Sequence, residues 1–200
     1  MHNELLPSIE RSLRQTTHKR GSMKTIIDLA LKPNPGVAEK MRAEHDRILG
    51  PDPAKASNKL VGSPHLLNAL TYTGAVIKES VRLYPGPGSF RDGEPRYHLA
   101  DRETGEKYLT DGFMLWESVR SQSRSEAVWP RPLEVLPERW LTTDVNDPLY
   151  PTKHARRNFG IGYRNCMGQE LAVVEMKLVL ALLVRHIDLD CAWDERDAMK

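Results

Sequence analysis

Cysteine is scarce in this 200-residue chain, which contains only Cys166 and Cys191. Two cysteines cannot build a disulfide scaffold, and the lack of a Cys-x-x-Cys pair excludes a zinc ribbon or a thioredoxin-like site. No run reaches the roughly 18 consecutive apolar residues that cross a bilayer, and the N-terminal stretch is too polar for a secretory signal. Excess charge is also missing, because 29 basic and 27 acidic residues leave a net charge of +2. A general nucleic-acid binder would be strongly basic. The sequence therefore indicates a globular chain of a reducing compartment with no membrane-spanning segment.

Proline and glycine divide the first half of the chain into helical segments. Residues 1–23 are expected to form a polar, basic tail, and residues 24–31 a short helix. A helix is predicted over 35–49, because Asn34 and Pro35 are typical of a helix start and Gly50 of a helix end. A further helix or helix pair is predicted from Ser63 to about Leu83.

The second half changes character. Residues 96–109 contain two strand-like runs around a glycine turn, and residues 113–119 resemble another strand. A last helix, from about Gln169 to His186, is apolar on more than one face, which is typical of a mostly buried helix. The predicted fold class is mainly α with a small antiparallel β-sheet.

The most informative stretch is the loop from Phe159 to Gly168, FGIGYRNCMG. It fails as a dinucleotide-binding loop, because Asn165 occupies the third glycine position. Its glycines allow tight turns with positive φ and the close approach of a flat ligand. Cys166 directly precedes the last predicted helix, whose N-terminal dipole favours a thiolate, and Arg164 adds a cation that can neutralise a carboxylate. A lone cysteine beside a helix is more often a small buried hydrophobe, but that interpretation leaves the glycines and the arginine unexplained.

This loop resembles the haem-binding loop of the cytochrome P-450 family, matching its Phe-Gly-x-Gly-x-Arg-x-Cys-x-Gly pattern at every specified position. The resemblance implies haem b (iron protoporphyrin IX) with Cys166 as its axial thiolate, whose electron push favours O–O cleavage. It implies that Phe159 packs near the sulfur and that Arg164 pairs with a haem propionate. Arg91, where the family's first sheet passes the haem, is a second propionate candidate, although a strand-edge arginine is usually just solvated. The glycines of the pattern are Gly160, Gly162 and Gly168.

Two further motifs occur in the family's order. Glu79 and Arg82 are three residues apart on a predicted helix, and Arg139 lies in the sequence Pro-Glu-Arg-Trp. Alone, the first would be an ordinary surface pair and the second a charged loop. Together they resemble the family's Glu-x-x-Arg helix and Pro-Glu-Arg loop. The resemblance implies a buried cluster of one acid and two bases, held by hydrogen bonds, with a structural rather than a catalytic role.

The resemblance covers roughly residues 24–190 but only the proximal, C-terminal part of the family fold, so residues 24–200 are expected to form a truncated domain. Family members carry a distal helix with a Gly-x-Asp/Glu-Thr acid–alcohol pair, which this sequence lacks. The segments that flank that helix in the family meet here at Pro33, as if the helix were excised. A splice product, a misjoined gene model or a decayed gene would each give this pattern. The apolar side of the last helix is then expected to be exposed.

The first hypothesis is a haem-thiolate monooxygenase that inserts one oxygen atom from O₂ into an organic substrate, with electrons from an NADPH-dependent reductase. Residues 148–169 contain no acid, so the reductase is expected to dock near Lys153, Arg156 and Arg157, or these residues are simply a charged surface loop. The surviving motifs are closest to fungal-type members, which suggests secondary metabolism. Full-length relatives are typically bound to the endoplasmic-reticulum membrane, and this chain lacks their anchor.

Two alternatives remain. In the first alternative, the chain is a haem-binding or inert remnant without turnover, which the missing acid–alcohol pair favours. In the second, it is a hydrolase with Cys166 as nucleophile and His154 as base. Such a site, however, needs no glycine-framed loop with an arginine two residues before the cysteine. Cys191 is interpreted as inert.

Overall fold

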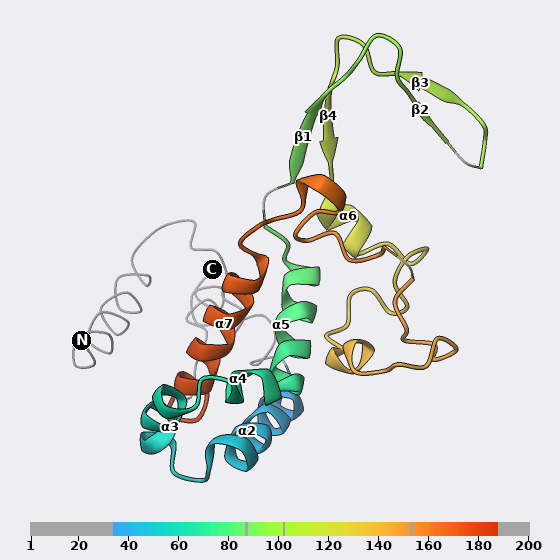
Figure 1. The fold of residues 1–200 in the computed structure, drawn as a ribbon. Coiled ribbons are helices and arrows are strands. Elements are labelled where there is room, and N and C mark those ends of the chain that lie inside the picture. Colours follow the sequence, from blue (N-terminus) through green and yellow to red (C-terminus); the bar gives the residue numbers. More distant parts are fainter. Residues whose placement is uncertain (1–33, 87, 102, 153, 188–200) are drawn as a thin grey trace, which may run out of the picture.

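The computed structural model describes residues 34–187, apart from 87, 102 and 153. The expected tail 1–23, the expected helix 24–31, the junction at Pro33, Lys153 and Cys191 all lie outside the described residues. The described part is mainly helical with two small antiparallel sheets, which confirms the predicted fold class (Figure 1). None of its helices combines the length and apolarity that a bilayer crossing requires.

The helices gather at one end of the described structure (Figure 1). They are α2 (Pro35–Leu49), α3 (Ala56–Gly62), α4 (Leu66–Ala69), α5 (Thr71–Leu83) and α7 (Gln169–Leu183). The short helices η2 (Pro53–Lys55), α6 (Val119–Ser123), η3 (Pro137–Trp140) and η4 (Gly162–Arg164) lie in the connections. The predicted bounds of α2 are confirmed: proline occupies its first position, and Gly50 ends it with a φ of +91°, which side-chain-bearing residues rarely adopt.

Two apolar clusters hold the helices together. The first joins α2, α5 and α7 through Met41, Val76 and Leu180, each almost fully buried. The second joins the end of α2 to α3, α4 and α7, with Leu49 and Ala181 at its centre. Burying one large apolar side chain stabilises a fold by about 1.5–3 kcal/mol. Helix α2 and the C-terminal half of α7 contribute to both clusters and so join them.

The N-terminal half of α7 departs from the expectation of a mostly buried helix. Only Leu180, Ala181 and Leu183 of α7 are buried, whereas Leu171 is 63% exposed and Val174 and Leu178 about 40% exposed. These three exposed residues follow an i, i+3, i+7 spacing and so share one face. An all-round apolar pattern predicts burial only where other elements cover each face, and no described element covers this one. The helix also ends at Leu183, three residues before the predicted His186.

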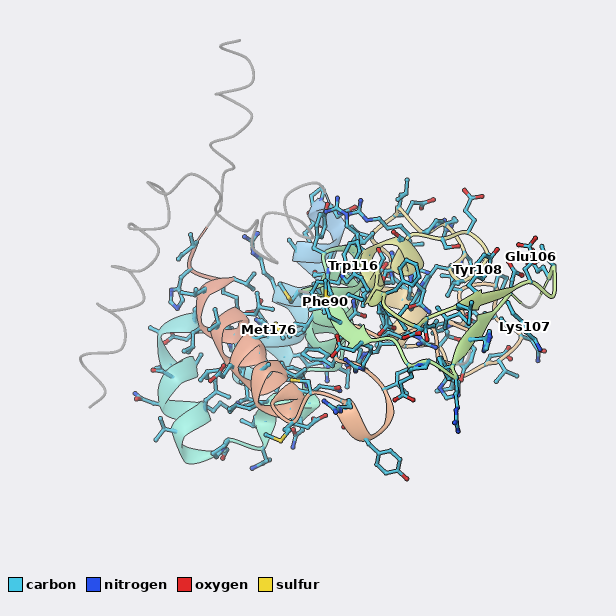
Figure 2. All side chains as sticks on the ribbon, turned by 90° about the horizontal axis from the view of Figure 1, so that it is seen from above. Phe90, Glu106, Lys107, Tyr108, Trp116 and Met176 are labelled. Carbon is cyan, nitrogen blue, oxygen red and sulfur yellow. The ribbon has the colours of Figure 1, made fainter. Side chains whose placement is uncertain are left out.

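The strands form two separate antiparallel pairs rather than one sheet. β1 (Ser89–Asp92) pairs with β4 (Met114–Glu117), and β2 (His98–Ala100) pairs with β3 (Lys107–Leu109), as an insertion between them. Thr110 lies between the two pairs. Its buried hydroxyl accepts from the N–H of Glu94 and contacts the carbonyls of Glu94 and Tyr97, so these backbone groups are not part of a continuous ladder. Figure 2 shows the exposed rings of Phe90 and Trp116 side by side, on the neighbouring strands β1 and β4, with centroids 6.4 Å apart.

Glu44 of α2 caps α5 from another helix. The residue before α5 is Leu70, which has no side-chain oxygen to accept from the free N–H groups of the first turn. Instead the Glu44 carboxylate accepts from the backbone N–H groups of Tyr72 and Thr73, at 2.7 and 2.8 Å, and from both threonine hydroxyls nearby. An acidic group at a helix N-terminus is stabilised by the helix dipole, so this contact fixes α5, the helix that carries Glu79, against α2.

His45, next to Glu44, gives a prediction about pH. Burial lowers the pKa of His45 to about 4, from 6.5. The unfolded chain therefore binds a proton between those values that the folded chain does not, so stability falls as pH decreases below 6.5. We expect a loss of up to about 1.4 kcal/mol per pH unit from this residue. Urea unfolding of wild type and His45→Gln between pH 7 and pH 5 measures it. The variant should lose this slope, and parallel curves for the two proteins would contradict the prediction.

Candidate functional site

The loop from Phe159 to Gly168 is a short, closed turn that leads into α7. Gly160 and Gly162 have φ values of +76° and +75°, so both positions favour glycine for the reason the sequence indicated. The N–H of Cys166 donates to the carbonyl of Phe159 at 2.7 Å, which closes the turn. The loop thus presents Cys166 directly before the N-terminus of the 15-residue helix α7.

Cys166 is exposed, as are all loop residues from Gly160 to Gly168. It is therefore not the small buried hydrophobe that is the ordinary interpretation of a lone cysteine. A Cβ added to Gly168 would come 3.9 Å from the Cys166 sulfur, an ordinary contact, so the glycine backbone lies beside the thiol without crowding it. One face of the loop is thus open to a flat group.

The donor set around Cys166 fits a haem better than a protein-bound metal ion. Among the described residues no group of three or more His, Cys, Asp or Glu side chains could hold a metal. Zinc sites need three or four protein ligands, whereas a haem iron is held by the porphyrin and needs a single axial thiolate from the protein. The residues present fit that group.

The other residues predicted to contact haem have different surroundings. Phe159 is half-buried, and the Arg156 guanidinium lies 6.0 Å from its ring centroid. Arg164 and Arg91 are exposed, and neither forms an ion pair with a described carboxylate. Nη1 of Arg91 donates to the carbonyl of its neighbour Phe90 at 2.7 Å. No described hydrogen bond joins Arg91 to the loop.

The structure brings Glu79, Arg82 and Arg139 together, with all three side chains fully buried. Arg82 donates to both Glu79 oxygens at 2.9 Å, and Nε of Arg139 donates to one of them at 3.1 Å. Every guanidinium nitrogen that does not contact Glu79 donates to a backbone carbonyl, and Nη2 of Arg82 donates to one as well as to Glu79. The carbonyls are those of Ser123, Pro132 and Glu134 for Arg82 and of Pro130 and Arg131 for Arg139. The cluster is thus hydrogen-bonded throughout, as a buried charge group must be.

Sequence reasoning missed two tryptophans in this cluster. Nε1 of Trp140 donates to Glu79 at 2.9 Å, and Trp140 follows the Pro-Glu-Arg motif directly, which could have indicated it. Trp129 is fully buried, with the guanidinium carbons of Arg82 and Arg139 at 5.1 and 5.7 Å from its ring. Nothing in the local sequence marks Trp129. The two guanidinium groups carry one more positive charge than Glu79 balances. The negative face of the Trp129 ring attracts that excess charge through cation–π contacts.

The basic residues expected to bind a partner have separate environments. Arg157 forms a half-exposed ion pair with Glu117 at 3.2 Å, and Arg156 is half-buried beside Trp140. Arg156 also lines an open groove of about 650 Å³ between α5, α7 and η3, together with Lys78 and Lys177. Burial lowers the pKa of each of these three groups, and for Lys78 the other two cations lower it further. The two lysines, about a hundred positions apart in sequence, were not predicted.

His154, the base of the hydrolase alternative, is exposed and has a φ of +63°. No described hydrogen bond joins it to Cys166, and no described carboxylate pairs with it. A nucleophile–base pair needs contact within hydrogen-bond reach, with a third group that orients the base. The described contacts give this alternative no support.

The chain belongs to the cytochrome P450 family, whose model matches residues 25–199 and so includes the whole Cys166 loop. It is 38% identical over 170 residues to the cytochrome P450 monooxygenase polC of Polytolypa hystricis, covering 85% of this chain and 30% of that relative. It is 30% identical to the monooxygenase acrF of Aspergillus aculeatus, covering 82% of this chain and 36% of the relative. It is also 30% identical to vinorine hydroxylase of Rauvolfia serpentina, covering 90% and 35%. The chain spans about a third of the length of these relatives.

Membership of this family implies a haem with a cysteine thiolate ligand, and it confirms the family resemblance inferred from the sequence.

The cluster generates a prediction about stability. Removing one partner of a buried ion group costs about 3–5 kcal/mol, which is comparable to the total stability of a small domain. Glu79→Ala, Arg82→Ala and Arg139→Ala should therefore each abolish soluble protein or lower its unfolding midpoint sharply in urea.

Glu138→Ala is the matched control, since Glu138 precedes Arg139 in the same motif. It forms a half-exposed pair with Lys40 at 2.7 Å, worth about 0–1 kcal/mol. Soluble variants of Glu79, Arg82 and Arg139 with the stability of the control would show that the cluster does not hold the fold.

Proposed function

We propose that Cys166 is the axial thiolate ligand of a haem b in the oxygen-activating centre of a monooxygenase. The observation that carries the proposal is an exposed thiol, directly before the N-terminus of α7, in a turn whose glycines leave one face open. A helix N-terminus stabilises a thiolate through its free N–H groups and its dipole. Bound there, the haem would supply the iron chemistry that activates O₂ for insertion of one oxygen atom into an organic substrate.

The surrounding residues have separate roles in this proposal. Phe159 packs beside the ligand loop, and Gly160, Gly162 and Gly168 keep its backbone close to the macrocycle. Arg164 and Arg91 are the partners for the propionates, which is supported by their exposure and by the lack of an ion pair with any described carboxylate. A guanidinium can hold a carboxylate through two parallel hydrogen bonds. Glu79, Arg82 and Arg139 have a structural role: they stabilise the part of the fold that carries the Cys166 loop and contact no reacting group.

An acidic, NADPH-dependent reductase is proposed to dock on the groove lined by Lys78, Arg156 and Lys177. The sequence predicted docking near Lys153, Arg156 and Arg157. The groove keeps Arg156 but not Arg157, because Arg157 is already paired with Glu117. The groove also contains Glu170, but cations outnumber it. Such a basic surface raises the encounter rate with an acidic partner, and the effect weakens with salt.

The second candidate is a haem-binding remnant without coupled turnover. The sequence contains no Gly-x-Asp/Glu-Thr pair, and the apolar face of α7 with Leu171, Val174 and Leu178 is exposed among the described residues. Hydroxylation needs the substrate held against the reacting centre. Both observations favour this candidate for the 200-residue chain taken alone.

The ligand assignment predicts a spectroscopic result. The chain is expressed with added hemin, reduced, and exposed to CO. A thiolate-ligated iron gives a strongly red-shifted Soret band, which Cys166→Ser should abolish because serine supplies no thiolate. Cys191→Ser is the matched control and should retain the band. Identical spectra for wild type and Cys166→Ser would overturn the assignment.

The remnant candidate predicts uncoupled electron flow. With a reductase present, the 200-residue chain should consume NADPH and release peroxide or superoxide without product, because its sequence lacks the Gly-x-Asp/Glu-Thr pair. NADPH, product and peroxide are quantified together, and the assay is repeated at rising salt. Consumption should fall steeply with salt if the basic groove docks the reductase. Product formation in proportion to NADPH consumption would contradict the remnant candidate. A rate of NADPH consumption that does not change with salt concentration would contradict the docking surface.

A further inference from the structure

Three consecutive side chains directly before the cysteine loop contact three different elements. The Arg156 guanidinium lies 6.0 Å from the ring centroids of both Trp140 and Phe159. Arg157 pairs with Glu117 at the end of β4, at 3.2 Å. Asn158 donates from its side-chain amide to the carbonyl of Val81 in α5, at 2.6 Å. The chain is therefore tied to η3, β4 and α5 in the three residues before Phe159.

The Asn158 contact satisfies a carbonyl that the helix cannot satisfy itself. In α5 the C=O of Val81 would accept from the N–H of the residue four positions later. That residue is Pro85, which has no N–H. The Val81 carbonyl is one of the free acceptors at the end of the helix, and the amide of Asn158 is the described donor that reaches it. This gives a chemical reason for an amide side chain at position 158.

The Arg156 contact links the loop to the buried cluster. Trp140 donates to Glu79 at 2.9 Å, so its indole is held by the cluster. Arg156 lies over that indole and over the Phe159 ring, and burial lowers its pKa, which the Glu170 carboxylate partly offsets. A planar guanidinium stacks on aromatic rings in a way that a lysine ammonium does not. The position of Phe159 is thus fixed relative to Glu79 through two aromatic contacts of one side chain.

Phe159 in turn holds the cysteine. Its carbonyl accepts from the N–H of Cys166 at 2.7 Å, while the residues between, 160–165, are exposed. An exposed turn has few packing contacts of its own. The contacts that fix its first residue, Phe159, therefore also fix Cys166, which is hydrogen-bonded to it. The contacts at 156–158 are the ones that fix this base.

We propose that Arg156 and Asn158 are positioning residues that set the orientation of the Cys166 loop, with Arg157 as a weaker, half-exposed third tether. The part of the proposal that concerns iron rests on the proposed function; the part that concerns the loop does not. Loss of either main tether should loosen the turn and let the thiol leave its position.

The loop is tested first without haem, by hydrogen–deuterium exchange of the peptide that spans 159–168. Asn158→Asp keeps the shape of the side chain but removes the donor, and Arg156→Lys keeps the charge but removes the planar group. Each should speed exchange of the Cys166 amide about three- to tenfold, the effect of losing one ordinary hydrogen bond or contact. Amides in α5 should be unchanged. Arg120→Ala, an exposed arginine on α6, is the control and should match wild type.

The second readout uses the hemin-loaded chain with reduced iron and CO. The variants should convert a larger share of the red-shifted thiolate band into the blue-shifted band of a displaced thiolate, and Arg157→Lys should stay near wild type because it keeps the ion pair. Wild-type exchange in Asn158→Asp and Arg156→Lys would overturn the proposal, as would faster exchange spread evenly over α5. If Cys166→Ser leaves the spectrum unchanged, the haem assignment fails, and the exchange data alone decide whether the tethers hold the loop.

Discussion

The Glu79 carboxylate is the acceptor on which the described structure depends most. It is fully buried and accepts from Arg82, Arg139, Trp140 and the backbone N–H of Leu136. A buried carboxylate costs several kcal/mol to desolvate unless such donors compensate it. Those donors come from α5, η3 and the segment between them. The need to satisfy one charge therefore draws together parts of the chain about 60 residues apart in sequence.

The same requirement explains the irregular segment 130–136, which precedes η3. Two guanidinium groups bring more N–H donors than Glu79 can accept, and the backbone carbonyls of this segment take the remainder. Regular helix or strand structure would use those carbonyls internally. Irregular backbone leaves these carbonyls free to accept from a buried arginine, and the Trp129 ring lies within 5.1 and 5.7 Å of the two guanidinium carbons.

The sequence predicted those features that local residue types determine. Asn34–Pro35 and Gly50 bound α2, and Gly160 and Gly162 of the Cys166 loop have the positive φ that the sequence indicated. The three charged residues of the cluster were found because a motif resemblance joined two distant segments. Features that depend on the partner were missed: Glu44 caps a helix on another element, and Trp129 is recognisable only by what surrounds it. The exposed apolar side of α7 was predicted from the family resemblance, whereas the helix pattern alone predicted a mostly buried helix. Periodicity describes a helix face but not its neighbour.

The path from Glu79 to Cys166 lies entirely within the described part of this chain. It runs from the carboxylate to the Trp140 indole, across the Arg156 guanidinium to Phe159, and through the Phe159 carbonyl to the Cys166 N–H. Each step is a contact between residues of this chain, which spans about a third of the length of its relatives. The exposed apolar face of α7, by contrast, has no such internal support among the described residues. The thiolate side of the proposed haem site is thus organised by this chain's own contacts, whereas the oxygen side has to be organised by groups that those contacts do not supply.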